Sequence, residues 1–104
     1  MRNGNTELAE ERYRASMRED PMYLPVQLTL ADLLERTGRR EEAFGLMNQA
    51  QKSFSAAPEP LQLLGEFLVR QKRLQEARQM FELALSRRPD YEPSKKWLKD
   101  LSVP

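Results

Sequence analysis

The sequence predicts an all-α protein of about six antiparallel helices, and two observations carry that prediction. First, the 104-residue chain resembles itself after a shift of 34 positions, which indicates a repeated structural unit. Under this shift, a motif of a small, a large and another small residue recurs three times at constant spacing: Ala9-Tyr13-Ser16, Ala43-Met47-Ala50 and Ala77-Phe81-Ala84. Second, apolar residues recur at helical spacing in residues 27–36 and 61–69.

Each repeated unit is predicted to contain a helix, a short break and a second helix. The breaks fall at residues 37–39 and 71–73, and acidic residues follow in the first turn of the next helix. Prolines mark the joints between units, because proline stops a preceding helix and is tolerated in a first helical turn. The predicted helices span about residues 5–19, 24–36, 40–54, 59–70, 74–87 and 93–101.

The small residue at the start of each second helix has a packing reason. An alanine such as Ala77 lets two helices cross closely, and the larger Phe81, four residues later on the same face, fills the space beside it. A larger residue in place of Ala77 is therefore expected to overpack the crossing.

Composition excludes several classes of function. The chain has no Cys and no His, which argues against zinc fingers, iron–sulfur clusters, disulfides and imidazole catalysis. Phosphate-binding glycine loops and the nucleophile-elbow motif are absent from the sequence, and the serines have no histidine to activate them. We therefore expect no enzyme activity, no cofactor and no metal site.

Charge and hydropathy argue against two further partners. The 17 Lys and Arg nearly balance the 16 Asp and Glu, and no apolar run approaches the length of a membrane span. Basic residues cluster at the breaks, but acidic residues accompany them and no aromatic residues interleave, as a single-strand binder would require. The sequence thus predicts neither nucleic-acid binding nor membrane insertion.

Residues 58–91 resemble the tetratricopeptide repeat (TPR) family. Its pattern, W-x2-L-G-x2-Y, then A-x3-F and a proline, reads here as Leu61-x2-Leu64-Gly65-x2-Leu68, Ala77-x3-Phe81 and Pro89. Residues 24–57 match less well, with Gln27 and Ser55 at the usual large apolar and proline positions. The resemblance implies a right-handed superhelix, that is, a solenoid of stacked helix pairs.

The resemblance also divides the single predicted domain into repeats. Residues 5–21 form a half repeat with the second helix only, residues 24–57 and 58–91 form two full repeats, and residues 92–104 form a capping helix. In that last segment Trp97 is expected to pack as part of the cap, and the alternative is an anchor for a partner.

In TPR proteins, the first helix of each pair lines a concave face that binds a peptide or a helix of a partner protein. Carried onto this chain, the resemblance implies eight partner-binding residues, namely Leu28, Asp32, Glu35, Arg36, Gln62, Glu66, Val69 and Arg70. The alternative is that these residues form only the solvated side of amphipathic helices. One TPR subgroup holds a C-terminal carboxylate, but Asp32 and Glu66 would repel it, so a basic and apolar segment fits better.

The N-terminal half repeat leaves a second possibility open. Its apolar residues Leu8, Tyr13 and Met17 lack the first helix that would cover them, so this edge is a candidate for homodimer formation. The chain would then serve as a spacer or scaffold. A third possibility is that it is a regulatory segment of a larger enzyme or secretion machine. A fragment of a longer array is compatible with the periplasm, whereas a complete chain suggests the cytoplasm. The predominance of Arg among the basic residues suggests a bacterial source.

Overall fold

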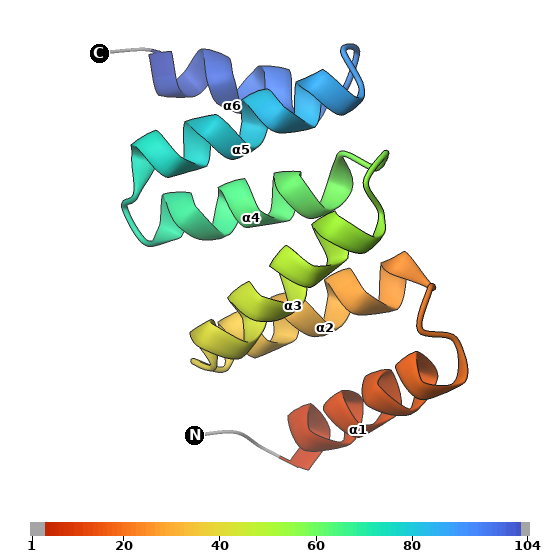
Figure 1. Cartoon of the computed structure of the whole chain (residues 1–104). Coiled ribbons are helices and arrows are strands. Elements are labelled where there is room, and N and C mark those ends of the chain that lie inside the picture. Colours follow the sequence, from red (N-terminus) through yellow and green to blue (C-terminus); the bar gives the residue numbers. More distant parts are fainter. Residues whose placement is uncertain (1–3, 103–104) are drawn as a thin grey trace. The chain divides into compact units, whose positions relative to one another are not determined.

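The computed structural model describes residues 4–102, and within this range the chain is all-α, with six helices and no strand. Figure 1 shows their order along the chain, and the helices are α1 (Gly4–Glu19), α2 (Leu24–Arg36), α3 (Arg40–Ser53), α4 (Glu59–Arg70), α5 (Leu74–Arg87) and α6 (Glu92–Ser102). Each predicted helix is confirmed, and its ends agree with the structure to within one residue.

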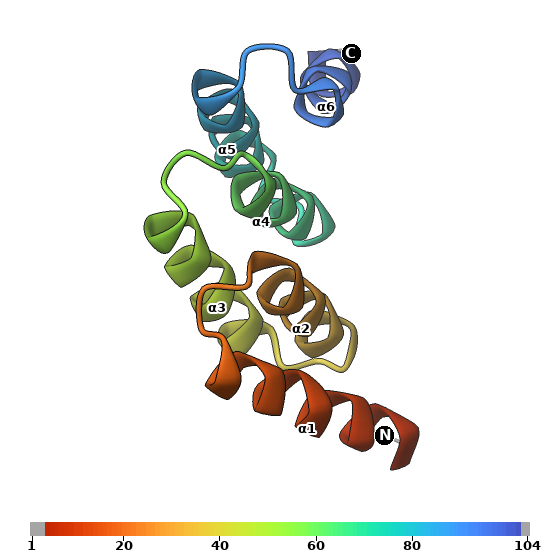
Figure 2. The ribbon, with the colours of Figure 1, turned by 90° about the vertical axis from the view of Figure 1, so that its right-hand side faces the viewer.

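The helices fall into two compact units. The first ends at Ser53 and contains α1, α2 and α3, and the second begins at Phe54 and contains α4, α5 and α6. In the first unit α2 packs against α1 and α3, and in the second α5 packs against α4 and α6. Figure 2 shows α2 beside α3 and α4 beside α5, so each full repeat is one helix pair.

The turns inside the two pairs share one geometry. Gly38 and Lys72, one repeat apart, have positive φ angles of 85° and 62°. The amide nitrogens of Arg39 and Arg73, which follow them, donate to the carbonyl oxygens of Leu34 and Leu68. This is the hydrogen bond that closes a helix ending in a left-handed residue. Glycine adopts that conformation readily, whereas in Lys72 it brings the Cβ atom unfavourably close to the backbone.

The two repeat cores are built from the predicted apolar positions. In the first unit the fully buried residues of α2 and α3 are Leu30, Ala31, Leu34, Ala43, Met47 and Ala50. In the second unit the buried hydrophobic residues of α4 and α5 include Leu61, Leu64, Phe67, Leu68, Ala77, Phe81 and Ala84.

The helices α4 and α5 cross closely at Gly65. A Cβ added at Gly65 would lie only 2.4 Å from Cε1 of Phe81, which real atoms do not permit. The phenyl ring of Phe81 therefore occupies the space that Gly65 leaves empty. In the first unit the same crossing uses Ala31 and the flexible side chain of Met47, and both residues are fully buried.

Candidate functional site

The four residues predicted on α2, which we call the α2 stripe, reach the surface of that helix. Leu28, Asp32 and Glu35 are partly exposed, and Arg36 is exposed. The guanidinium of Arg36 forms an ion pair with the carboxylate of Asp32, with an N–O distance of 3.0 Å. This pair has helical i,i+4 spacing and faces solvent, so it leaves both groups accessible to a partner.

The corresponding stripe on α4 is more enclosed. Val69 and Glu66 are partly exposed and Arg70 is exposed, whereas Gln62 is only 7% exposed. The Gln62 amide donates from Nε2 to Oε2 of Glu66 at 2.7 Å, and its Oε1 accepts from the hydroxyl of Ser94 at 2.6 Å. Gln62 is thus held inside the fold, where it orients Glu66.

Within the second unit, α4 and α6 border a cavity of about 390 Å³. Its lining residues are Gln62, Glu66, Glu92, Pro93, Lys96 and Trp97. The indole of Trp97 stacks on the ring of Phe81, with the centroids 5.5 Å apart and the planes within 8°. We call this cavity the α4–α6 groove.

Charged groups of both signs lie close to this groove. Burial raises the pKa of Tyr91, and the negative charges of Glu59 and Glu66 raise it further against the opposing charge of Arg88. Arg88 also lies 5.9 Å from the centre of the Tyr91 ring, and its guanidinium pairs with Glu59 at 3.7 Å. The charge of Glu66 therefore acts beyond its own helix.

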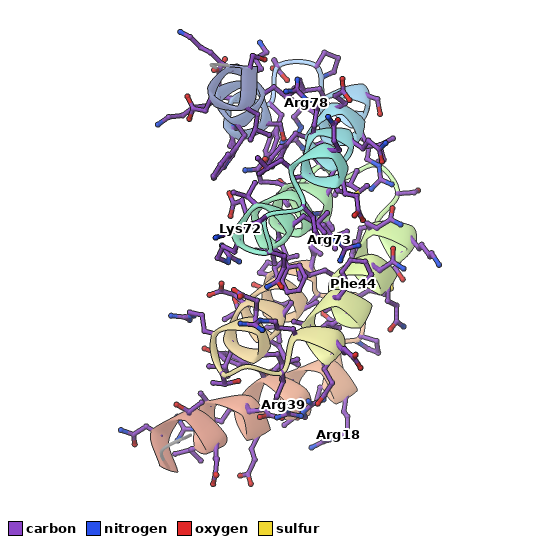
Figure 3. All side chains as sticks on the ribbon, turned by 90° about the vertical axis from the view of Figure 1, so that its left-hand side faces the viewer. Arg18, Arg39, Phe44, Lys72, Arg73 and Arg78 are labelled. Atoms are coloured by element: carbon purple, nitrogen blue, oxygen red, sulfur yellow. The ribbon has the colours of Figure 1, made fainter. Side chains whose placement is uncertain are left out.

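The basic residues at the breaks are engaged by neighbouring carboxylates. Arg39 and Arg73 each form an ion pair with the acidic residue three positions later, Glu42 and Glu76, at 2.5 Å in both cases. Figure 3 labels Arg39 and Arg73 among the side chains of the two units. These pairs support the interpretation that the positive charges of the basic clusters are balanced by the acidic residues in the first turn of the following helix.

Comparison with known proteins identifies the family. A family model described as tetratricopeptide repeat matches the chain twice, over residues 1–58 and 28–92. The chain belongs to the tetratricopeptide repeat family. The two matches end one repeat length apart, in agreement with the internal shift of the sequence. No curated protein matches the chain. TPR domains generally mediate protein–protein interactions and are typically non-enzymatic scaffolds.

Three groove residues of this TPR chain were missed as candidates by the sequence analysis. Pro93 and Lys96 stand one repeat after Glu59 and Gln62, and Glu92 begins the same helix. Pro93 and Lys96 could have been identified by the 34-residue shift if α6 is taken as the first helix of another repeat. Trp97 was considered as a cap or as an anchor, and it both stacks on Phe81 and lines the groove.

The N-terminal edge lies on α1. Leu8 is 46% exposed, and Tyr13 and Met17 are partly exposed. The same helix bears a shallow hollow of about 520 Å³, lined by Glu11, Arg12, Arg14, Ala15 and Arg18. Met17 borders a second hollow with Arg14 and Arg18, so apolar and basic groups adjoin on this helix. Arg18, labelled in Figure 3, extends from α1.

The described part of the chain lacks two further features. Among residues 4–102, no group of three or more acidic or metal-ligating side chains is arranged to hold a metal ion. None of the described helices is long and apolar enough to cross a membrane.

Proposed function

We propose that this TPR chain is an adaptor that binds a basic and apolar peptide or helix of a partner protein. The contact residues would lie on the stripes of α2 and α4, which form the concave face that the family resemblance implies. One observation carries the proposal: each stripe presents a partly exposed carboxylate at the same repeat position. These are Asp32 and Glu66, each held by a neighbour four residues away on its own helix.

The chemistry of the stripes determines the kind of partner. Leu28 on α2 and Val69 on α4 supply partly exposed apolar contact area beside the carboxylates. On either stripe, a partner segment that alternates apolar and basic residues would bury the apolar side chain and pair a cation with the carboxylate beside it. A C-terminal carboxylate would instead meet charges of its own sign.

The binding mechanism would use preformed surfaces. The carboxylate of Asp32 is paired with Arg36, and that of Glu66 accepts from Gln62, so both orientations are set before a partner arrives. Binding would then cost little ordering of the adaptor itself.

The test is a charge reversal on both stripes. The Asp32→Arg, Glu66→Arg double variant is compared with Glu19→Arg, Glu82→Arg, which makes the same charge change at exposed positions of α1 and α5. Partners are captured on each immobilised protein, identified by mass spectrometry and retested as purified proteins by calorimetry. We expect the stripe variant to lose at least tenfold in affinity, since a charge-assisted contact contributes about 1.5–3 kcal/mol.

Folding of both variants is checked by circular dichroism and thermal unfolding. Unchanged affinity in a folded stripe variant would contradict the proposal. Loss of binding in the control variant alone would place the interface elsewhere.

A second candidate function is self-association through α1, favoured by the 46% exposure of Leu8 beside partly exposed Tyr13 and Met17. Light scattering over a concentration series would show a dimer that Leu8→Glu dissociates. A strict monomer at the highest concentration would contradict this candidate. It would leave the adaptor proposal standing.

A further inference from the structure

We infer that the α4–α6 groove takes an arginine side chain of the partner segment, with its guanidinium on Glu66 and beside the indole of Trp97. This inference rests on the proposed adaptor function and specifies its partner chemistry. It also makes α6 part of the binding surface rather than only a cap. The groove lies entirely within the second unit, so its walls belong to helices that pack in one compact body.

The position of Glu66 is set by two linked hydrogen bonds, one buried and one partly buried. Ser94 on α6 is fully buried and donates to Oε1 of Gln62, whose Nε2 donates to Oε2 of Glu66. The amide of Gln62 is thereby locked in one orientation, because its oxygen faces the hydroxyl and its nitrogen faces the carboxylate. A carboxylate offers about four lone-pair sites, so Glu66 keeps acceptor capacity after it has accepted from Gln62.

Trp97 supplies the flat wall of the groove. Phe81 covers one face of the indole, so the part that remains accessible belongs to the opposite face and the ring edge. Guanidinium groups pack on tryptophan faces and bind carboxylates with two parallel N–H groups. A groove that combines one indole and one oriented carboxylate therefore suits arginine better than the compact ammonium of lysine.

The other charges of the groove adjust the affinity. Glu92 adds a second carboxylate, which is strongly exposed and lies 3.7 Å from Lys95. Lys96 places an ammonium on the same lining, and it would repel an incoming guanidinium. The inference thus predicts opposite effects from two neutralising substitutions on the same groove.

The experiment uses Trp97 as its own reporter, since the chain has a single tryptophan. An acetylated, amidated pentapeptide with one arginine between leucines is titrated against the full chain. The indole N–H signal of Trp97 and its fluorescence are followed. The matched probe carries citrulline, which keeps the shape of arginine and removes its charge. We expect a saturable shift with the arginine peptide and at least a tenfold weaker response with citrulline.

Variants then locate the contact. Glu66→Gln should weaken binding of the arginine peptide about tenfold or more, because it removes the ionic acceptor. Lys96→Gln should strengthen it by about two- to fivefold, because a like charge is removed from an exposed site. The control Glu82→Gln makes the same neutralisation as Glu66→Gln on the exposed surface of α5 and should leave the affinity unchanged.

Each outcome decides the inference. A Trp97 response that prefers arginine, falls in Glu66→Gln and rises in Lys96→Gln supports it. A silent Trp97, an equal response to citrulline, or equal affinities in the two groove variants overturns it. Failure here is separable from failure of the adaptor proposal. If Trp97 does not respond to the peptide but the Asp32→Arg, Glu66→Arg variant fails to capture the partner, the stripes remain the interface. The partner then places no arginine in the groove.

Discussion

The outer helices of the two units, α1 and α6, are attached by different forces. On α1, Glu10 accepts two hydrogen bonds from Nη1 of Arg39, at 2.6 and 2.7 Å, and another from Nε of Arg14 at 2.9 Å. On α6, Trp97 stacks on Phe81 and Ser94 is fully buried against Gln62. The attachment of α1 should therefore respond to pH and to charge, and that of α6 to side-chain volume.

The same comparison holds for the repeated motif of small and large residues. On α5 the ring of Phe81 is fully buried between Gly65 and Trp97, whereas the equivalent Tyr13 on α1 is only partly buried. Identical sequence spacing thus gives different degrees of burial, because burial depends on the helices that cover the motif.

The largest predicted effect is the truncation of Phe81. Phe81→Ala should reduce the free energy of unfolding by about 3–5 kcal/mol, because it leaves a cavity between α4, α5 and α6. The repeat-equivalent Tyr13→Ala should cost about 1 kcal/mol, since its side chain keeps solvent contact. Chemical denaturation monitored by circular dichroism measures both. Equal losses would show that burial does not distinguish the two positions.

The next effect concerns the glycine at the close crossing. Gly65→Ala should destabilise the fold by about 1–3 kcal/mol, because the new Cβ would meet the ring of Phe81. The matched control is Gly45→Ala on α3, where an added Cβ meets nothing within 4 Å. We expect that control to stabilise the chain by about 0.5–1 kcal/mol. A neutral Gly65→Ala variant would mean that α4 and α5 are not held this close.

A smaller effect tests the ionic attachment of α1. Glu10→Gln should cost about 0.5–1.5 kcal/mol, because it removes one of the two carboxylates that pair with the partly buried Arg39 and leaves only Glu42. Glu76→Gln breaks the exposed pair with Arg73 in the second unit and should cost less than Glu10→Gln, because solvent screens that pair. Hydrogen exchange should show faster exchange along α1 in the first variant. Unaltered exchange there would contradict the ionic attachment.

The smallest effect is a pH dependence. Burial alone would raise the pKa of Glu10, but the hydrogen bonds and charges of Arg39 and Arg14 outweigh it and lower that pKa. The hydrogen bond from Arg39 likewise lowers the pKa of Glu42. Their stabilisation is therefore fully present above the usual carboxyl value of 4.5 and is lost as pH falls through it towards the lowered values.

The control for this dependence is Glu10→Gln itself. Its stability should fall less steeply between pH 5 and pH 3 than that of the native chain, because one of the two carboxylates with a lowered pKa is gone. The pH range is set by the usual carboxyl pKa of about 4. Parallel curves for the two proteins would contradict the assignment of the pKa shift to Glu10.

The sequence was sufficient for the helices and the family. Prolines and apolar spacing located all six helices, and the motif ending in Phe81 identified the repeat. The side-chain networks were beyond the sequence. The pairing of Glu10 with Arg39 depends on how α1 packs against its unit, and the burial of Gln62 depends on Ser94, a residue on another helix. The positive φ of Lys72 could have been predicted from the 34-residue repeat, since Lys72 is equivalent to Gly38.

The most direct test of the account is a footprint of the captured partner on the chain. Hydrogen–deuterium exchange is measured with and without the purified partner and resolved by helix. The account predicts slower exchange on α2, α4 and α6, which carry the stripes and the groove. Protection confined to α1, with α4 and α6 unchanged, would contradict it and make the N-terminal edge the interface.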